Sequence, residues 1–207
     1  MSPALIVIAK APAPGRSKTR LTPPLSPEAA AGLAAASLAD TLAAVVACPA
    51  ERRVLALEGE PGAWVRPGFE VIAQRGDGLA ERLASAFEDV GDPALLIGMD
   101  TPQVTPVLLA EGLHSLMRPG TDAVLGPALD GGYWAIGLRR PRRDVFLGVP
   151  MSSSATFKVQ LARLRAAGLR VRPLVPLRDV DLIEDARAVA SLVPRSRFAE
   201  AFGGLAA

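Results

Sequence analysis

Short apolar runs alternate with stretches of helical periodicity along the chain. The continuous apolar runs predict strands at residues 5–9, 54–57, 71–73, 94–98, 123–126, 133–138 and 171–175. Apolar side chains at helical spacing predict helices after Ser26, at 79–90, from Thr105 to about residue 117, at 156–167 and at 182–192. This alternation favours an α/β three-layer sandwich with a mostly parallel central sheet. Because no repeat, low-complexity tract or linker divides the series, we expect one domain, residues 1–207.

Composition narrows the class of protein. Half of the residues are hydrophobic and 21% are charged, which is typical of a soluble globular protein. A net charge of +2 and an aromatic content of 4% give little support for a nucleic-acid partner. Cys48 is the only cysteine, which fits a reducing compartment. Residues 29–50 are long and apolar, but Asp40 in their middle would cost about 2.5–3.5 kcal/mol in a bilayer. We therefore expect a cytoplasmic protein with no membrane partner.

A basic loop follows the first apolar run. The run ends at Lys10, and Gly15 is followed by Arg16, Lys18 and Arg20, with no acidic residue among them. Backbone N–H groups at a glycine turn and cationic side chains converge readily on anionic oxygens. The loop therefore predicts a polyphosphate site with these four cations as ligands. A solvated turn is the alternative.

The loop matches neither of two familiar phosphate motifs. A P-loop would place glycines where Pro12 and Ser17 stand, and a dinucleotide fingerprint needs three spaced glycines where only Gly15 is present. The phosphate prediction therefore depends on charge and on the preceding strand rather than on a standard motif.

Two acidic segments are candidate metal sites. Asp100 follows the predicted strand at 94–98, and a carboxylate there suits Mg²⁺, which takes oxygen ligands. It would equally serve as a turn or helix cap. Asp179 and Asp181 lie near the start of the last predicted helix, where Asp181 and Glu184 also resemble a capping box. A metal site requires Asp181 or Asp179 to reach Asp100 across the fold.

The segment GPALDGGYWAIGL combines paired glycines with an acid. Gly131 and Gly132 allow a close backbone approach or an ordinary hairpin turn, and Tyr133 follows them. Asp130 is a candidate general base or acceptor ligand. The arginine-rich run at 139–143 is interpreted either as a solvated turn or as a site for an anionic acceptor or partner.

Five blocks taken in order resemble a known family. AKAPAPGRSKTRL, QRGDGLAERL, LIGMDTPQV, GPALDGGYWAIGL and DVDLIEDA are similar to segments of small bacterial transferases related to 2-phospho-L-lactate guanylyltransferase and the molybdenum-cofactor nucleotidyltransferases. These belong to the GT-A-type nucleotide-diphospho-sugar transferase superfamily, and the resemblance covers residues 5–190. It is specific for the family but not for a substrate.

The resemblance implies roles for matching positions. It implies that nucleotide phosphates lie on Gly15, Arg16, Lys18 and Arg20, and that the base lies along Gln74, Gly76 and Gly78. It implies Mg²⁺ or Mn²⁺ on Asp100 and Asp181, with Asp179 beside them. With the residue chemistry above, the expected catalytic residues are Lys18, Asp100 and Asp130, and the expected acceptor-binding residues are Gly131, Gly132 and Tyr133. The order of Gly and Asp in QRGDGLAERL and the MSSSAT segment depart from the family pattern, which leaves base and acceptor open.

Nucleotidyl transfer from a nucleoside triphosphate to a small phosphorylated acceptor is the expected activity. Metal on Asp100 and Asp181 would bridge to the α-phosphate, while Arg16 and Lys18 neutralise the departing pyrophosphate. One alternative is a glycosyltransferase that uses a nucleotide-diphospho-sugar, with Asp130 as its base. Another is a protein that binds a nucleotide without turning it over. A homodimer is left open as the assembly.

Overall fold

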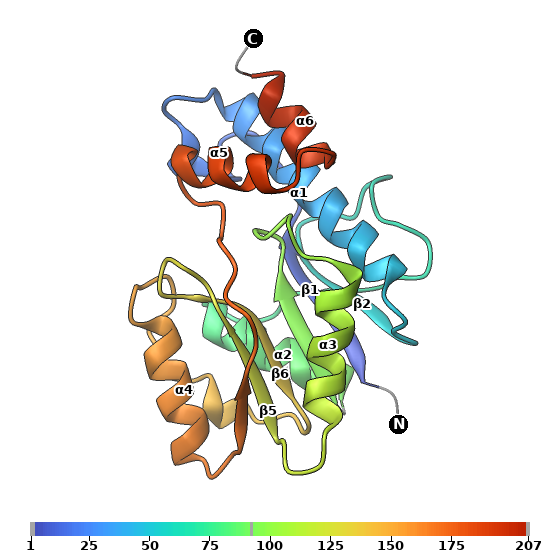
Figure 1. Ribbon diagram of the computed structural model, residues 1–207, viewed down its shortest axis with the longest axis vertical. Coiled ribbons are helices and arrows are strands. Elements are labelled where there is room, and N and C mark those ends of the chain that lie inside the picture. The colour runs from blue at the N-terminus through green and yellow to red at the C-terminus, as the bar shows by residue number, and fades with distance from the viewer. Residues whose placement is uncertain (1–2, 92, 206–207) are drawn as a thin grey trace.

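The computed structural model describes residues 3–91 and 93–205, which fold around a seven-stranded sheet of order β3-β2-β1-β4-β6-β5-β7 (Figure 1). The strands are β1 (Ala4–Lys10), β2 (Arg53–Glu58), β3 (Glu70–Ala73), β4 (Ala94–Gly98), β5 (Ala123–Pro127), β6 (Tyr133–Leu138) and β7 (Val171–Pro173). Neighbouring strands are parallel except where β6 pairs with β4 and β5. The predicted mostly parallel sheet is confirmed.

Helices cover both faces of the sheet. The α-helices are α1 (Pro27–Ala47), α2 (Leu79–Val90), α3 (Pro106–Met117), α4 (Thr156–Ala166), α5 (Ile183–Leu192) and α6 (Arg197–Gly203), and the short 3-10 helices are η1 (Thr19–Leu21) and η2 (Arg143–Val145). Apolar side chains of α1 and α3 pack on one face, and those of α2 and α4 pack on the other. The predicted three-layer α/β sandwich is therefore confirmed.

Local signals placed most of the helix ends correctly. The Ser26 hydroxyl accepts a hydrogen bond from the backbone N–H of Ala29 at 3.1 Å, as expected for the cap of α1. The predicted capping role of Asp181 and Glu184 is wrong. Asp185 instead accepts the N–H of Leu182 at 3.0 Å, because α5 begins one residue later than predicted. The strand predicted at 171–175 ends at Pro173, and α6 was not predicted.

A third apolar cluster joins the two ends of the chain. It consists of Leu21, Ala30, Leu33, Val180, Ala186, Val189 and Phe198. Figure 1 shows α5 and α6 beside the first half of α1, above the sheet. Asp40 of α1 accepts the backbone N–H groups of Arg197 at 3.3 Å and Phe198 at 2.9 Å, which fixes the start of α6. The C-terminal helices therefore hold the loop that carries Leu21.

Helix α1 is long and apolar enough to cross a membrane by length and composition, and 56% of its most apolar window is buried inside the protein. That burial is what a core helix of a globular domain shows.

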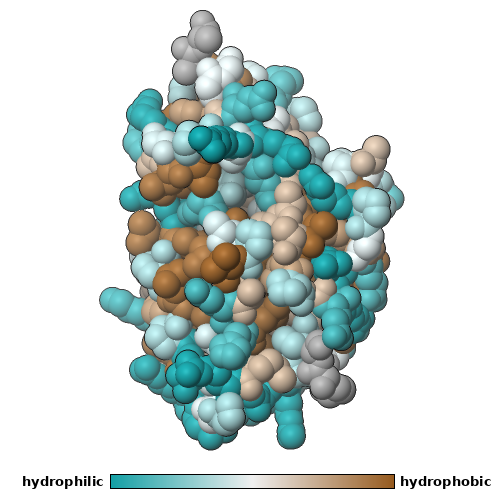
Figure 2. Space-filling model, turned by 45° about the vertical axis from the view of Figure 1, so that its right-hand side comes forward, coloured by the Kyte–Doolittle hydropathy of each residue, from teal (hydrophilic) through white to brown (hydrophobic). Residues whose placement is uncertain are grey.

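Figure 2 shows a largely hydrophilic face on which apolar side chains gather near mid-height on the left. The cytoplasmic location stays a prediction.

Candidate functional site

A cleft opens where the chain reverses its direction of travel across the sheet. From β1 the chain first adds β2 and β3 on one side, and β4 then returns to pair with the other side of β1. Loops at the carboxyl ends of strands diverge at such a switch point, and ligands bind there in open α/β sheets. The cleft has a volume of about 580 Å³, within the usual range for a small-molecule site.

Most of the predicted site residues meet in this cleft. Those that line it are Lys10, Arg16, Lys18, Arg20, Gln74, Gly78, Asp100, Tyr133, Asp179 and Asp181. The predicted site residues that do not line it are Gly15, Gly76, Asp130, Gly131 and Gly132. The requirement that Asp100 and the 179–181 segment approach each other is met. The roles of these residues stay predictions.

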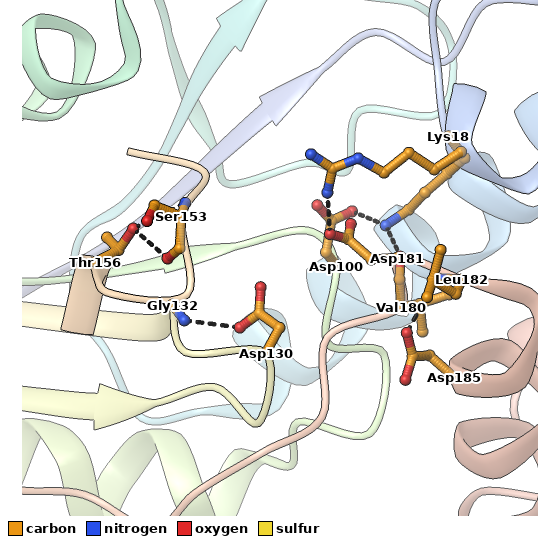
Figure 3. A network of polar contacts seen from close by, with 11 residues as sticks. Lys18, Asp100, Asp130, Gly132, Ser153, Thr156, Val180, Asp181, Leu182 and Asp185 are labelled. Atoms are coloured by element: carbon orange, nitrogen blue, oxygen red, sulfur yellow. Dashed lines mark hydrogen bonds and ion pairs between the residues drawn. The ribbon is translucent and has the colours of Figure 1, made fainter. Parts of the chain in front are cut away.

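Lys18 lies at the centre of the basic loop. Its backbone adopts the left-handed conformation, with φ of 51°, which is uncommon outside glycine. Its side chain is 8% exposed, and its ammonium lies 2.6 Å from Asp100 Oδ1 and donates to the backbone carbonyl of Val180 (Figure 3). Leu21, fully buried in the third apolar cluster, anchors the loop three residues further on. Lys18 therefore connects the basic loop, the segment that follows β4 and the 179–181 segment.

The other cations of the loop differ in their partners. Arg20 pairs with Asp181, with 2.5 Å between guanidinium Nη1 and carboxylate Oδ2. Lys10 lies 3.3 Å from Glu58, which also pairs with Arg82. Burial raises the pKa of Glu58, but these two cations outweigh it and hold the pKa below its ordinary value. Among the described residues Arg16 is exposed and makes no ion pair, so its charge is available to a ligand.

Asp179 is an acid in an unusual environment. One of its carboxylate oxygens, Oδ1, is buried and has no hydrogen-bond partner among the described residues. Burial raises the pKa of Asp179 to about 8, and the nearby charges of Asp100, Asp130 and Asp181 act in the same direction. Lys18 opposes that shift. A buried carboxyl crowded by other acids and lacking a partner is the environment that a divalent cation would neutralise.

The donor set fits a hard divalent cation that also binds phosphates. In residues 3–91 and 93–205, no three His, Cys, Asp or Glu side chains are placed to hold a metal ion together. Mg²⁺ in phosphate-transfer sites commonly uses one or two carboxylates, with waters and substrate phosphates as the remaining ligands. Asp100 and Asp181 provide such a pair beside the partnerless oxygen of Asp179. Asp100 does not cap α3, because the Thr105 hydroxyl accepts the N–H of Leu108 at 3.2 Å.

Asp179 predicts a pH dependence of stability in metal-free protein. A carboxyl whose pKa is about 8 in the folded state keeps its proton where the unfolded chain, with a pKa near its ordinary value, has lost it. Stability should therefore fall as pH rises from about 4 to 8. We expect Asp179→Asn to remove this slope and to stabilise the protein at pH 9 by about 1–3 kcal/mol.

Urea denaturation in EDTA at pH 5, 7 and 9 measures this effect. Glu51→Gln, which removes an exposed acid without an ion pair among the described residues, is the control and should follow the wild type. Parallel pH profiles for wild type and Asp179→Asn would contradict the assignment.

Gln74 is held rigidly at the ends of β1 and β2. Its side-chain amide donates to the backbone carbonyls of Ala9 at 2.8 Å and Ala56 at 3.0 Å. Both amide protons are thus used, and Oε1 is left as an acceptor. Gly76, with φ of 123°, packs so closely on Glu81 that an added Cβ would lie 2.5 Å from its Cβ. The segment therefore turns tightly into α2, whose first turn borders the cleft.

The β5–β6 hairpin forms the wall opposite the basic loop. Asp130 Oδ1 accepts the N–H of Gly132 at 2.8 Å, so this acid closes the turn (Figure 3). A Cβ on Gly131 would lie 2.2 Å from the backbone oxygen of Ser154, so Gly131 allows the hairpin to pack against the segment before α4. Tyr133 reaches the cleft, and burial raises the pKa of its phenol far above the ordinary value. The two glycines therefore shape this wall without lining the cleft.

The arginine run at 139–143 lies away from the cleft. Tyr133 at the start of β6 lines the cleft, and the arginine run follows the other end of this strand. The six residues of β6 separate the two ends of the strand by about 17–20 Å. Arg139 donates to the carbonyls of Leu116 and Arg118. Arg142 pairs with Asp144, and Arg143 pairs with Glu88. The run therefore serves the surface of the fold and does not hold an acceptor in this cleft.

A family comparison places the chain in a known family. A family model described as an uncharacterized protein conserved in bacteria (DUF2064) matches residues 33–153. The chain belongs to the DUF2064 family. No curated protein matches it.

Solved structures extend the comparison for this DUF2064 member. A "putative nucleotide-diphospho-sugar transferase" from Desulfovibrio desulfuricans G20 is 28% identical, with a TM-score of 0.88, and the match covers 98% of this chain and 94% of that chain. CMP:2-keto-3-deoxy-manno-octonic acid synthetase complexed with CTP has 14% identity and a TM-score of 0.60, over 94% and 99% of the two chains. Rv0371c from Mycobacterium tuberculosis H37Rv, in complex with manganese, has 20% identity and a TM-score of 0.56, over 91% and 97%. The last two show the fold alone. The predicted relationship to GT-A-type nucleotide-diphospho-sugar transferases is confirmed.

Sequence reasoning missed several residues of the cleft in this DUF2064 protein. Arg82, Thr101 and Ser152 line it, and Thr101 Oγ1 is buried without a partner among the described residues. An arginine within a helix is ordinary, so Arg82 gave no signal before its pairing with Glu58 was seen. Ser152 has a φ of 56° and lies in the MSSSAT segment, whose departure from the family pattern was the available signal.

Proposed function

We propose that residues 1–207 form a metal-dependent transferase domain that moves a nucleotidyl group from a nucleoside triphosphate to a small phosphorylated acceptor and releases pyrophosphate. The observation that carries the proposal is the 2.6 Å pair between Lys18 and Asp100 at the switch point of the sheet. In this pair the basic loop, which we propose binds the phosphates, meets an acid suited to a metal, and Asp179 and Asp181 line the same cleft. Phosphoryl transfer requires this combination, because its catalysis depends on positioning and on charge neutralisation.

Asp100 and Asp181 are the proposed ligands of Mg²⁺ or Mn²⁺, with Asp179 as a neighbouring acid. When bound, such a cation supplies positive charge at the α-phosphate. The manganese complex of the structural neighbour Rv0371c supports a divalent metal in this fold. The CTP complex of CMP:2-keto-3-deoxy-manno-octonic acid synthetase supports a triphosphate donor in the same way.

The chain's own residues would position the other groups. Arg16 and Lys18, with Lys10 and Arg20 nearby, would neutralise the pyrophosphate as the bond from its oxygen to the α-phosphorus breaks. Gln74 would accept a hydrogen bond from an N–H group of the base, since both of its own amide protons are used. An acceptor phosphate oxygen attacks the α-phosphorus as an anion, so no base is needed for that step.

Glycosyl transfer is the second candidate. The neighbour from Desulfovibrio desulfuricans G20, at 28% identity, bears the name of a nucleotide-diphospho-sugar transferase. In that reaction an acceptor hydroxyl must lose its proton, and Asp130, at the turn of the β5–β6 hairpin and outside the residues that line the cleft, is the acid proposed to take it. Its carboxylate already accepts the N–H of Gly132, so a second oxygen would serve.

A thermal-shift panel with Mg²⁺ separates these activities. Nucleoside triphosphates at about 100 times their Kd should stabilise the protein by about 2.7 kcal/mol. The melting temperature should then rise by about 5–10 °C. Arg140→Gln, beyond the far end of β6, is the control and should respond like the wild type. Stabilisation by nucleotide sugars alone would exclude nucleotidyl transfer, and pyrophosphate release with any phosphorylated acceptor would exclude a binding-only protein.

A further inference from the structure

The Lys18 ammonium occupies a position beside Asp100 from which a divalent cation would have to displace it. The ammonium lies between Asp100, at the end of β4, and the carbonyl of Val180, which separates Asp179 from Asp181 in the chain (Figure 3). The side chain is 8% exposed, so this positive charge is largely withdrawn from water. The ammonium therefore neutralises Asp100, one of the two acids that the proposed function assigns to a metal.

Arg20 forms a similar ion pair with Asp181, nearer to the solvent than the pair of Lys18 with Asp100. Its guanidinium lies 2.5 Å from Asp181, the second proposed metal ligand. The pair is more accessible, with side-chain exposures of 60% and 31%, so solvent weakens it. Each acid proposed to bind metal is therefore paired with a cation proposed to bind phosphate.

We propose that Lys18 and Arg20 are exchangeable cations, which pair with Asp100 and Asp181 in the ligand-free protein and transfer to the phosphates when metal and nucleotide bind together. The inference rests on the proposed function and adds a rule for how its two ligands depend on each other. The site would accept the metal–nucleotide complex and discriminate against either component alone.

The physical reason is the cost of leaving charges unpaired. Metal alone must displace the Lys18 ammonium from Asp100 and leave it largely buried without its counter-charge. Nucleotide alone must draw Lys18 and Arg20 away and leave Asp100 and Asp181 beside the partnerless oxygen of Asp179. When both ligands bind, every acid and every cation has a new partner. Coupling of this kind is reciprocal and typically amounts to about 5- to 150-fold in affinity.

Mn²⁺ binding without nucleotide, followed by electron paramagnetic resonance of the free ion, tests the exchange. Lys18→Met removes the competing ammonium and keeps an unbranched apolar side chain that is one heavy atom shorter. We expect it to bind Mn²⁺ about 5- to 150-fold more tightly than the wild type. Arg20→Met should give a smaller gain, because its pair is more exposed. Arg16→Met removes a charge from the same loop without breaking an ion pair, and its Mn²⁺ affinity should stay within about twofold.

The converse experiment uses inorganic tripolyphosphate in EDTA, measured by calorimetry. Asp181→Asn frees Arg20, and we expect tighter metal-free tripolyphosphate binding than in the wild type. An unchanged or weaker affinity would overturn the inference. This second variant also decides the question if circular dichroism shows that Lys18→Met fails to fold.

Asp100→Asn distinguishes failure of the exchange from failure of the proposed function. If this variant binds Mn²⁺ as the wild type does, Asp100 is not a metal ligand and the function proposed above is wrong. If it loses Mn²⁺ while Lys18→Met shows no gain, the metal site stands and the exchange is wrong. Loss in Asp100→Asn together with a gain in Lys18→Met supports both.

Discussion

Replacing Asp100 with Asn is expected to lower the rate of transfer by about 10²- to 10³-fold, because the neutral amide no longer holds a divalent cation at the α-phosphate. The Mg²⁺-dependent rise in melting temperature with nucleotide should disappear as well. The melting temperature of the metal-free protein should change by only about 2–4 °C, equivalent to about 1 kcal/mol. Asp100 is 44% exposed, and the new amide oxygen can still accept from Lys18.

Asp122→Asn is the matched control for the loss of one acidic charge. Asp122 pairs with Arg170 beside β5, outside the cleft, and that contact lowers its pKa to about 2. Its loss should leave transfer and the Mg²⁺ response unchanged. A large loss of stability in Asp100→Asn with the metal response retained would indicate a structural role for Asp100 instead of a metal-binding one.

Replacing Leu21 with Ala is expected to lower the free energy of unfolding by about 2–5 kcal/mol, because a fully buried leucine leaves a cavity among the C-terminal helices. That loss corresponds to a fall in melting temperature of about 5–20 °C. Leu21 follows Arg20 directly, so the cavity also releases the loop that positions Lys18. We expect nucleotide affinity, measured well below the melting temperature, to fall by at least about tenfold.

Leu38→Ala separates these two effects. Leu38 is buried in α1 against the sheet, in a cluster whose buried residues include neither Leu21 nor any of the four cations of the basic loop. It should cost similar stability while leaving nucleotide affinity close to the wild-type value. Equal losses of affinity in both variants would mean that affinity follows global stability, and that the anchoring role of Leu21 is wrong.

The elements of the fold were largely predictable because their signals are local. Apolar periodicity located β4, β6 and α2 to the residue, and the serine before Pro27 capped α1 as expected. Helix α6 was missed because its packing depends on Asp40, which lies far away in the chain. The cap of α5 was assigned to the wrong acid for a local reason. Asp181 and Asp185 lie four residues apart, and a start of the helix one residue later makes Asp185 the acid that caps it.

For this protein, the sequence by itself determined the fold class, the basic loop after β1 and the family resemblance. Strand ends, glycine turns and clustered charges each depend on residues that are close together in the chain. Only the tertiary structure decided which charges meet. It paired Lys18 with Asp100 and Arg20 with Asp181, left Arg16 without an ion pair among the described residues, and placed the arginine run beyond the far end of β6. The reason is that an ion pair depends on the closeness of side chains, which the sheet order and the third apolar cluster set across more than half of the chain.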